Sequence, residues 1–588
     1  MSFDFGLRKG IGPHMRRQRI LKTAIFAAVL PCFLVSSAPS HAQAAPQSGQ
    51  LLQTVPQQQA PLPRRDLQLE YRLRDSKSLT DVEGMLIEVK GFRLTGLSLI
   101  PEAQVQKALQ PFVGANRNFQ TLIDAAAKVK EILAQHGYFL ANAIIPEQRI
   151  YEGVIEILVL EGKLGKVKIE YEEGVRINRS LVESYAAQLK PGSFVSAASV
   201  ERALFLISDL RGIQVQSMFE PGETVGTSDL NIKISRGKTV DANLDLDANG
   251  SIYTGIVRGS AGVDLSNPFA RGDLLSLRYT SALENVHPSP LQYARLSYLA
   301  PIGSRGTKIG ASVADLKYKL GTPIFEPLKA SGSAEVQSLI GIHPLVRSRN
   351  ANLLGTYQYD FRRFHDYQDT TRRTTDKSTS LSAFGLSGDL RDPLLGGGIN
   401  VFNASYTTGR LAFATDVLRA ADEAGHFTAG DYHKSNFTYS RLQSVTARTA
   451  VYFSYSAQYA NKNLDPSEKI SLGGPAAVRA YPQGEGAGDE GYFGTIEARH
   501  RLITPEKLPG IMVLTFFHDF GGSLLNKSPL EADTINRRRI AGLGFGLNWE
   551  VPGNWALRTS LAFPLTAHAL SEHVPRDPHM YLLLSKYF

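Results

Sequence analysis

The sequence contains one cysteine in 588 residues, Cys32. It lies in a short apolar stretch near the start of the chain, so we expect a mature protein with no disulfide, no thiol chemistry and no cysteine metal site. Apolar runs of 18 or more residues are also missing, which excludes a membrane protein built of several helices. A membrane β-barrel is not excluded. Its strands alternate apolar and polar residues and keep the mean hydropathy near that of a soluble protein, and here it is −0.15.

The motifs of common enzyme classes are missing as well. We find no Gly-x-Ser-x-Gly and no His-Glu-x-x-His. The stretch Gly542-Leu543-Gly544-Phe545-Gly546 has the glycine spacing of a nucleotide loop, but no helical pattern follows it. Its glycines are better explained as relief of crowding within a strand. His568, His573 and His579 lack the spacing of a zinc site on a helix. We therefore expect no enzymatic activity, no cofactor and no metal.

Residues 1–42 have the features of a signal peptide. A basic region precedes a short apolar core, Thr23–Val35, and small residues follow, with cleavage expected after Ala42 or Ala44. The basic residues are Arg16, Arg17, Arg19 and Lys22. Without residues 1–42 the net charge falls from +9 to +4. The remaining cations are interleaved with acids, so we expect no nucleic-acid partner.

Residues 43–85 are expected to be an N-terminal segment followed by a proline-rich linker. From Gln47 to about Thr80 the chain is rich in glutamine and is interrupted by Pro56, Pro61 and Pro63. This composition predicts an extended, partly disordered connector. Before the first proline, Gln47–Thr54 could form a short helix.

Residues 86–163 and 164–238 are predicted to be two copies of one small α+β unit with the order β-α-α-β-β. The predicted elements of the first copy are a strand near Ile87–Phe92, helices at Pro101–Leu109 and around Leu122–Leu133, and strands at Tyr138–Ile145 and Val154–Leu160. Those of the second are a strand at Val167–Tyr171, helices at Arg179–Leu189 and Ala197–Leu210, and strands at Ile213–Phe219 and Leu230–Ile234.

The two copies share a register, because Gly137 and Gly162 recur 75 residues later as Gly212 and Gly237. These glycines suit helix ends and turns that need a positive φ. No polar cluster in either copy has a catalytic pattern. An open edge of each sheet would offer backbone N–H and C=O groups that an extended foreign chain can join. We therefore hypothesise that both units bind nascent chains through open sheet edges.

Residues 239–588 show almost no helical periodicity and are rich in Gly, Tyr, Phe, Ser and Asn. Sixteen candidate strands follow one another: 239–249, 253–266, 273–283, 291–302, 307–320, 330–346, 350–366, 378–390, 397–411, 433–445, 449–460, 490–502, 511–524, 538–551, 554–566 and 580–588. Each is near or above the roughly 9–11 residues that cross an outer membrane at a tilt. An even number is expected for a closed antiparallel barrel.

Alternation within these strands separates two faces. In one strand Leu274, Ser276, Arg278 and Thr280 share a face opposite Leu275, Leu277, Tyr279 and Ser281. In the next, Tyr293, Arg295 and Ser297 are expected to point inward, and Ala294, Leu296 and Tyr298 toward lipid. The strands of a soluble β-sandwich also alternate apolar and polar residues. The signal peptide, the sixteen strands in series and a last strand that ends at Phe588 favour an outer-membrane barrel.

A loop expected at 461–489 carries a dense motif. Its centre reads Gly473-Gly474-Pro475-Ala476-Ala477-Val478-Arg479-Ala480-Tyr481, and a glycine-rich stretch, Gly484–Gly491, follows. A second cluster, Phe516-Phe517-His518-Asp519-Phe520-Gly521, lies in the strand after next.

These two stretches resemble the signature motifs of two-partner secretion transporters, the TpsB class. This class exports haemolysin- and filamentous-haemagglutinin-like proteins and includes secretion/activation proteins of the ShlB/FhaC/HecB type. It belongs with the outer-membrane barrel-assembly insertases. The resemblance covers the whole mature chain and implies two polypeptide-transport-associated (POTRA) domains before a sixteen-stranded barrel. It also implies that the loop folds back into the lumen, and that the N-terminal segment can plug the lumen as a helix.

The resemblance also assigns residues. The loop motif consists of Val478, Arg479, Ala480 and Tyr481, the barrel wall contributes Asp519 and Gly521, and Phe588 is the C-terminal barrel signal. Ala480 stands where the family has glycine, which matters only if that glycine adopts a positive φ. An arginine can hold a carboxylate with two parallel hydrogen bonds, so Arg479 and Asp519 could pin the loop inside a wide lumen. For Gln47–Thr54, a plug helix and an unstructured leader are both left open.

The leading hypothesis is a polypeptide transporter for type V secretion in the outer membrane. Its periplasmic domains would capture an unfolded, TpsA-like exoprotein, and its barrel would pass that protein to the cell surface. No ATP site is visible, so folding of the cargo outside would have to give direction. The expected partners are the exoprotein, the barrel-assembly machinery during insertion, and outer-membrane lipid. The alternatives are a barrel-assembly factor of the same superfamily and a passive porin, which would not need the two units.

Overall fold

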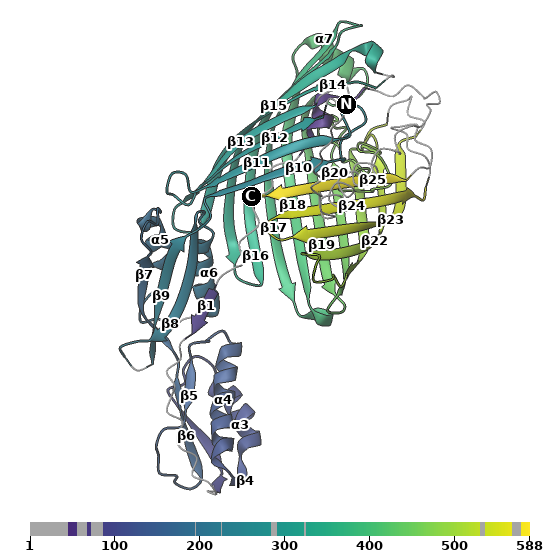
Figure 1. Ribbon diagram of the computed structural model, residues 1–588. Helices are drawn as coiled ribbons and strands as arrows, with labels where there is room; N and C mark the ends of the chain where they lie inside the picture. The colour runs from purple at the N-terminus through teal and green to yellow at the C-terminus, as the bar shows by residue number, and fades with distance from the viewer. Residues whose placement is uncertain are drawn as a thin grey trace, which may run out of the picture.

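The computed structural model describes residues 45–55, 68–71, 86–194, 196–224, 226–283, 291–322, 325–529, 535–566 and 578–588. The predicted signal peptide, His568 and His573 lie outside this part of the chain. Figure 1 shows two small α/β units that extend in line from one end of a closed barrel. We call the barrel end beside the units the near end and the opposite one the far end.

The first unit contains the predicted helices and strands in the predicted order, with additions. Its elements are β2 (Ile87–Val89), β3 (Gly91–Thr95), α3 (Glu102–Leu109), η1 (Gln110–Phe112), β4 (Gly114–Arg117), α4 (Phe119–Gln135), β5 (Asn142–Ile144) and β6 (Val154–Leu160). Helix α4 begins where the Asn118 side chain accepts a hydrogen bond from Thr121 N–H. Its apolar stripe, including Leu122, Val129 and Leu133, is fully buried in the core of the unit. The sheet order is β3-β6-β5, and β5 is shorter than predicted.

The second unit repeats this plan. Its elements are β7 (Lys163–Tyr171), α5 (Arg179–Ala186), α6 (Ala197–Ser208), β8 (Ile213–Pro221) and β9 (Thr227–Arg236). Asn178 and Ser196 cap the two helices through their side chains. The inner face of α6, with Leu204 and Ile207, packs against Ile232 and its neighbours in the sheet. None of the helices that the structure describes is both long and apolar enough to cross a membrane.

The shared glycines differ in conformation. Gly137 and Gly212, which follow the second helix of each unit, have φ of +89° and +73°, as a helix end requires. Gly162 also has a positive φ. Gly237 does not, so the prediction was wrong there. A Cβ on Gly237 would lie 2.9 Å from backbone atoms of Ile213, and glycine is needed for close approach instead.

In the second unit one sheet edge is covered, while β7 remains at the other edge. A strand from the linker, β1 (Gln68–Tyr71), pairs in parallel with β8, and the sheet order is β1-β8-β9-β7. The linker was expected to be an extended, partly disordered connector, and a strand within it was not predicted. Figure 1 shows β1 lying beside β8, on the side of the second unit that faces the first.

The predicted sixteen-stranded antiparallel barrel is confirmed. Its strands are β10 (Val240–Asp247), β11 (Arg258–Ser266), β12 (Leu274–Ala282), β13 (Gln292–Ile302), β14 (Thr307–Lys319), β15 (Ala330–Arg347), β16 (Ala351–Gln368), β17 (Arg373–Asp392), β18 (Gly398–Phe413), β19 (Gly430–Ser444), β20 (Thr449–Ala460), β21 (Glu490–Arg501), β22 (Ile511–Leu524), β23 (Arg537–Val551), β24 (Trp555–Pro564) and β25 (His579–Tyr587). A short helix, α7 (Asp416–Glu423), stands at the far end (Figure 1).

The barrel closes between its first and last strands. β10 and β25 pair over five residues, from Asn243↔Tyr587 to Asp247↔Leu583. Phe588, just beyond β25, donates its backbone N–H to Ala242 O at 2.9 Å and accepts a hydrogen bond from Lys238 Nζ at 2.7 Å. The C-terminal residue thus extends the seam by main-chain contacts, while its side chain is exposed.

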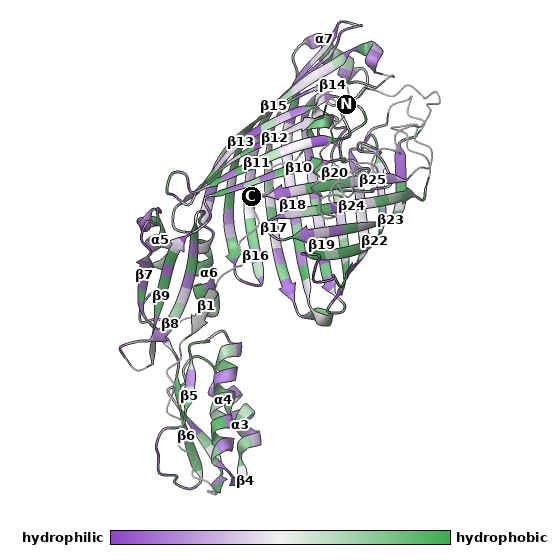
Figure 2. Ribbon diagram, in the orientation of Figure 1, coloured by the Kyte–Doolittle hydropathy of each residue, from purple (hydrophilic) through white to green (hydrophobic). Residues whose placement is uncertain are grey.

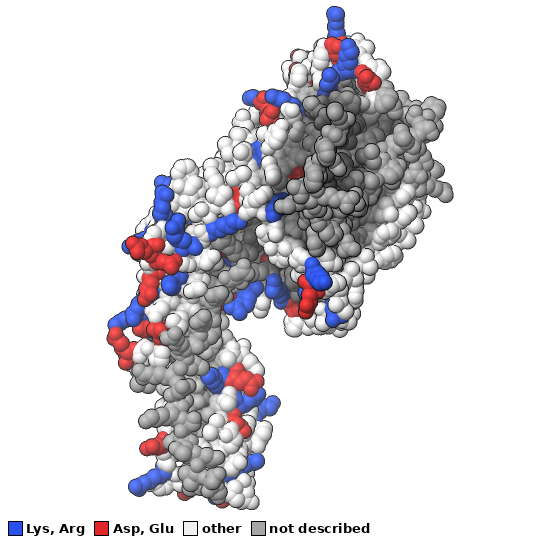
Figure 3. Space-filling view, viewed as in Figure 1, with Lys and Arg blue, Asp and Glu red and all other residues white. Residues whose placement is uncertain are grey.

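The two faces of the wall have the predicted character. On β12, Leu277 and Tyr279 are 52% and 45% exposed, whereas Thr280 on the opposite face is 3% exposed. On β13, Tyr293 is buried and Leu296 is exposed on the outside. Green segments run along the barrel strands in Figure 2. In Figure 3 most of the visible barrel wall is uncharged, and charged side chains gather on the two units and at the barrel ends.

An ion pair joins the second unit to the near end of the barrel. Arg347, the last residue of β15, donates to both carboxylate oxygens of Asp209 at 2.8 and 2.9 Å. Its guanidinium also lies over the ring of Phe205, 4.3 Å from the centroid. The side chain of Arg347 is fully buried. This contact fixes α6 against the mouth of the barrel.

Candidate functional site

The loop 461–489 folds into the barrel, between β20 and β21. Its buried tip packs against inward-facing side chains of the last strands and forms one apolar cluster of Leu472, Val478, Ala480, Tyr481, Phe517, Ile540 and Ala562. Leu472, Val478 and Phe517 are fully buried. The tip therefore has a specific binding surface on β22, β23 and β24.

The arginine and aspartate that the sequence singled out are in direct contact. Arg479 Nε donates to Asp519 Oδ2 at 2.9 Å, and Arg479 Nη2 donates to Asp519 Oδ1 at 2.7 Å. The backbone N–H of Arg479 also donates to Asp519 Oδ2 at 3.0 Å. Asp519 is fully buried on β22. The carboxylate thus holds both the side chain and the main chain of the loop tip.

Three further wall residues surround the same guanidinium; Phe517 belongs to the second motif cluster, whereas Thr495 and Glu497 lie outside both motifs. Arg479 Nη1 lies 2.8 Å from Glu497 Oε1, and Arg479 Nη2 donates to Thr495 Oγ1 at 3.0 Å. The guanidinium carbon lies 3.4 Å from the centroid of the Phe517 ring. Glu497 and Thr495 are on β21, one strand away from Asp519. Arg479 is therefore enclosed by two carboxylates, a hydroxyl and an aromatic face.

The other motif residues fit the wall by shape. A Cβ on Gly521 would lie 3.3 Å from Val478 Cγ2, so Gly521 leaves room for that valine. Ala480 does not have a positive φ, and alanine at this position causes no backbone strain. A Cβ on Gly542 would lie 2.4 Å from the Ala480 Cβ. The glycines of β23 thus relieve crowding, as predicted, and Gly542 does so for the loop.

Tyr481 completes the tip with polar contacts to two later parts of the chain. Its hydroxyl forms a 2.9 Å hydrogen bond with Thr566 Oγ1, and its backbone oxygen accepts one from Tyr581 at 3.1 Å. The side chain is 2% exposed.

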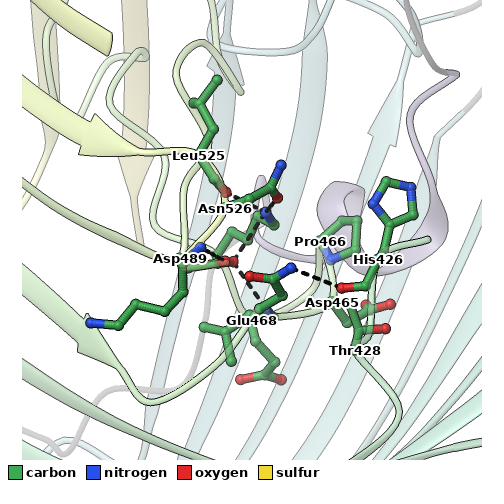
Figure 4. A network of polar contacts seen from close by, with 12 residues as sticks. His426, Thr428, Asp465, Pro466, Glu468, Asp489, Leu525 and Asn526 are labelled. Carbon is green, nitrogen blue, oxygen red and sulfur yellow. Dashed lines mark hydrogen bonds and ion pairs between the residues drawn. The ribbon is translucent and has the colours of Figure 1, made fainter. Parts of the chain in front are cut away.

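The loop presents buried acids to cations of the barrel wall. Glu485 pairs with Arg538 on β23, and Glu468 with both Arg362 on β16 and Lys434 on β19, at 2.8–2.9 Å. Within the loop, Lys469 lies 3.0 Å from Asp489. Figure 4 shows Asp489 beside Leu525 and Asn526 of the loop that follows β22. Strands from several sides of the barrel therefore hold one loop conformation.

A helix from the N-terminal segment lies in the lumen near the far end (Figure 1). It is α2 (Ser48–Leu52), and its position bears on the choice between a plug and an unstructured leader. Leu51, Leu52 and Val55 are buried in an apolar cluster with side chains of β13–β16, Tyr253 and Phe325. The short helix is thus packed as part of the core of the barrel.

Charged wall residues hold both ends of this segment. Asp366 on β16 accepts a hydrogen bond from Ser48 N–H at 2.8 Å, and Arg258 on β11 donates to Thr54 O at 3.1 Å. The carboxylate thus faces the free N–H groups at the start of the helix, and the guanidinium faces the carbonyls after its end.

The N-terminal segment and the loop also contact each other. Gln53 Nε2 donates to Ser467 O at 2.6 Å, and Gly49 approaches Ser467 so closely that a Cβ there would lie 2.5 Å from the serine Cβ. A cavity of about 610 Å³ lies beside this contact, lined by residues of α2, α7 and the loop. The lumen therefore holds two segments that pack on each other and leave space on one side.

Nothing in the described chain suggests a metal site. The residues that the structure describes include no group of three or more His, Cys, Asp or Glu side chains arranged to hold a metal ion.

The chain is similar to known proteins over most of its length. Residues 226–549 match the family model described as haemolysin secretion/activation protein ShlB/FhaC/HecB, and residues 87–162 match the ShlB-type POTRA domain. The heme/hemopexin transporter protein HuxB of Haemophilus influenzae is 27% identical over 78% of this chain and 80% of its own length. The outer membrane transporter CdiB of Escherichia coli is 23% identical over 82% of both chains. A solved structure of Escherichia coli CdiB, 19% identical, superposes with a TM-score of 0.65 over 87% of this chain and 92% of that one.

Proposed function

The chain belongs to the haemolysin secretion/activation protein family ShlB/FhaC/HecB, and we propose that it exports an unfolded exoprotein across the outer membrane. Its family consists of two-partner secretion transporters, not enzymes. The barrel is the conducting element in the outer membrane, and the two units stand in the periplasm at its near end. The far end, with α7, faces the cell surface.

The observation that carries the proposal is the content of the lumen. A closed barrel of sixteen strands holds α2 and the loop 461–489, and both are fixed by wall residues. Around α2, hydrogen bonds with Asp366, Arg258 and Ser467 hold the N-terminal segment in place. A lumen filled by segments of the protein itself suits a conduit that opens for a polypeptide better than a permanently open pore.

We also infer how the protein sits in the membrane. Exposed apolar residues on the outer face, among them Leu277, Leu296, Val313, Leu339 and Phe384, form the surface for outer-membrane lipid. Phe588 at the seam is the residue that the barrel-assembly machinery would recognise during insertion.

Export can be tested with cells that co-express a candidate exoprotein and the transporter. We expect secretion with the wild type and a loss of at least tenfold with Arg479→Ala and with Asp519→Ala. The matched control is the pair Arg410 and Asp431, which forms an equally short ion pair on the surface and is more than 60% exposed. Alanine at either control position should leave secretion unchanged, because exposed pairs contribute little. Heat-modifiable gel mobility reports whether each barrel is inserted.

The alternatives give different outcomes in the same cells. A passive porin would keep solute uptake in all variants and would tolerate deletion of residues 87–238. A barrel-assembly factor would change the levels of other outer-membrane proteins rather than of one exported protein. Unchanged secretion by well-inserted Arg479→Ala and Asp519→Ala variants would contradict the role of the loop.

A further inference from the structure

The linker strand β1 pairs with β8 at one edge of the second unit's sheet, although β1 is not part of that unit in the sequence. Its four residues pair in parallel with β8, from Gln68↔Gln216 to Tyr71↔Phe219. In the sequence β1 precedes the first unit, yet it joins the sheet of the second (Figure 1). It is therefore an added strand, in the way that a bound peptide is added to a sheet.

Among the residues that the structure describes, no added strand pairs at the same position of the first unit. The 75-residue offset between the copies aligns β5 with β8. β5 is the edge strand in the sheet order β3-β6-β5, whereas β8 is interior in β1-β8-β9-β7. The two units thus differ at one edge, and the difference is a segment of the linker.

We propose that the β8 edge of the second unit is an acceptor for an extended segment of the exported protein, and that β1 is a resident strand which that segment replaces. The proposal deepens the export function and rests on it. Pairing at a sheet edge uses backbone N–H and C=O groups, so it accepts many sequences, as an acceptor for an unfolded chain must. In the absence of cargo, β1 protects this edge from pairing with other chains.

The short pairing makes exchange feasible. β1 covers four of the nine residues of β8, so a longer cargo strand can form more backbone contacts than β1 does. The covalent tether favours β1 through its high effective concentration, which sets a threshold for the competing chain. A weakly pairing or already folded protein would not pass this threshold.

The same segment links the acceptor to the lumen. α2 ends at Leu52 inside the barrel, and β1 begins at Gln68 on the second unit. These two anchors hold opposite ends of one stretch of linker. When cargo replaces β1, one anchor is lost, and α2 gains freedom to leave the lumen. Cargo binding in the periplasm would thereby favour opening of the barrel.

Crosslinking tests the exchange directly. Glu70 and Met218 are register partners between β1 and β8, and Met218 and Asn231 are partners between β8 and β9. We would compare E70C/M218C with the control M218C/N231C, both with Cys32→Ser, in the secretion assay. After oxidation we expect export by the β1-locked variant to fall at least tenfold and to return on reduction. The control pair should export at the wild-type rate in both states, because it leaves β1 free to exchange.

The outcomes separate the two proposals. Wild-type secretion of the exoprotein must be seen first, and its absence would contradict the export function itself. If the wild type exports the exoprotein and the oxidised, fully crosslinked β1-locked variant exports it equally well, the acceptor site is wrong. Heat-modifiable mobility verifies that both crosslinked barrels are inserted.

A binding measurement gives an independent test on the purified full-length protein. The probe is a fluorescent peptide with the sequence of residues 64–75 of this chain. We expect it to bind a variant with residues 68–71 replaced by Gly-Ser-Gly-Ser about tenfold more tightly than the wild type if β1 covers the edge nine-tenths of the time. Equal affinity for both proteins, or no binding to either, would overturn the proposal.

Discussion

Lys377 and Asp465 form a buried ion pair between the barrel wall and the lumen loop. Nζ of Lys377 lies 2.6 Å from Oδ2 of Asp465, and the two side chains are 2% and 6% exposed. The same Nζ donates to Gln47 Oε1 at 2.6 Å, just before α2. One wall cation therefore holds the loop and the N-terminal segment together.

Replacing Lys377 by methionine should loosen both segments. The change leaves the Asp465 carboxylate buried without its cation, which costs about 3–5 kcal/mol, and it removes the contact to Gln47. We therefore expect the channel to spend a larger fraction of time in its open state. Recordings of ionic current across planar lipid bilayers measure this fraction. Lys317→Met is the matched control. The Lys317 side chain is 68% exposed, and its Nζ lies 3.5 Å from Asp315, farther than the 2.6 Å between Lys377 and Asp465. Equal currents for the two variants would show that Lys377 does not restrain the lumen.

The two carboxylates at Arg479 should differ in importance. Asp519 accepts three hydrogen bonds from Arg479, including one from the backbone, whereas Glu497 is shared with Arg499. Asp519→Asn should speed trypsin cleavage after Arg479 about tenfold, which corresponds to roughly 1.4 kcal/mol of easier opening. Glu497→Gln should have a smaller effect, and Asp431→Asn none. Mass spectrometry of the fragments measures the rate of cleavage in each variant. Faster cleavage in Glu497→Gln than in Asp519→Asn would contradict this assignment.

Substitution of Gly49 by alanine should displace α2. Its new Cβ would lie 2.5 Å from the Cβ of Ser467, closer than two such atoms can approach. We expect faster hydrogen–deuterium exchange in peptides that cover residues 46–55. Ser467→Gly removes the opposing Cβ, so the double variant should return toward the wild-type rate. If the second substitution gives no recovery, the contact between α2 and the loop is not the cause.

Ala480 and Gly542 should be coupled. Gly542→Ala would bring two Cβ atoms to 2.4 Å, and overpacking of this kind typically costs about 1–3 kcal/mol. Ala480→Gly should restore much of the loss, giving a coupling energy of about 0.5–3 kcal/mol. The temperature at which the folded barrel converts to its unfolded gel mobility is the measurement. Strictly additive shifts would mean that the two positions do not touch.

The barrel was predictable because each strand carries its own signal. Inward and outward positions alternate, so a strand such as β22 (Ile511–Leu524) could be bounded from local sequence. The longest strands, including β17, extend a few residues beyond the predicted ends. The residues beyond the predicted ends are polar, and they lack the alternation of apolar and polar residues that marks a lipid-facing strand. The strand β1 was missed because four residues in a proline-rich linker have no period long enough to detect.

The lumen contacts could be predicted only in part. The pairing of Arg479 with Asp519 came from the resemblance of two motifs to a family, not from their spacing. Glu468 lies outside both motifs, and the resemblance assigns no partner to Glu485. Their partners Arg362 and Arg538 lie more than 50 residues away in the chain. A charged residue in a loop normally indicates solvent exposure. Only the closed barrel shows that these acids are buried and paired.

The binding site of α2 also determines an order of assembly. Residues 46–55 are synthesised before every strand of the barrel, yet their contacts come from Arg258, Asp366, Lys377 and Ser467, much later in the chain. Leu51 and Leu52 can bury their side chains only after β13–β16 have formed a curved wall. Residues 46–55 are thus made before the barrel and are among the last to fold. We infer that a newly inserted barrel passes through a state in which the binding site of α2 is empty.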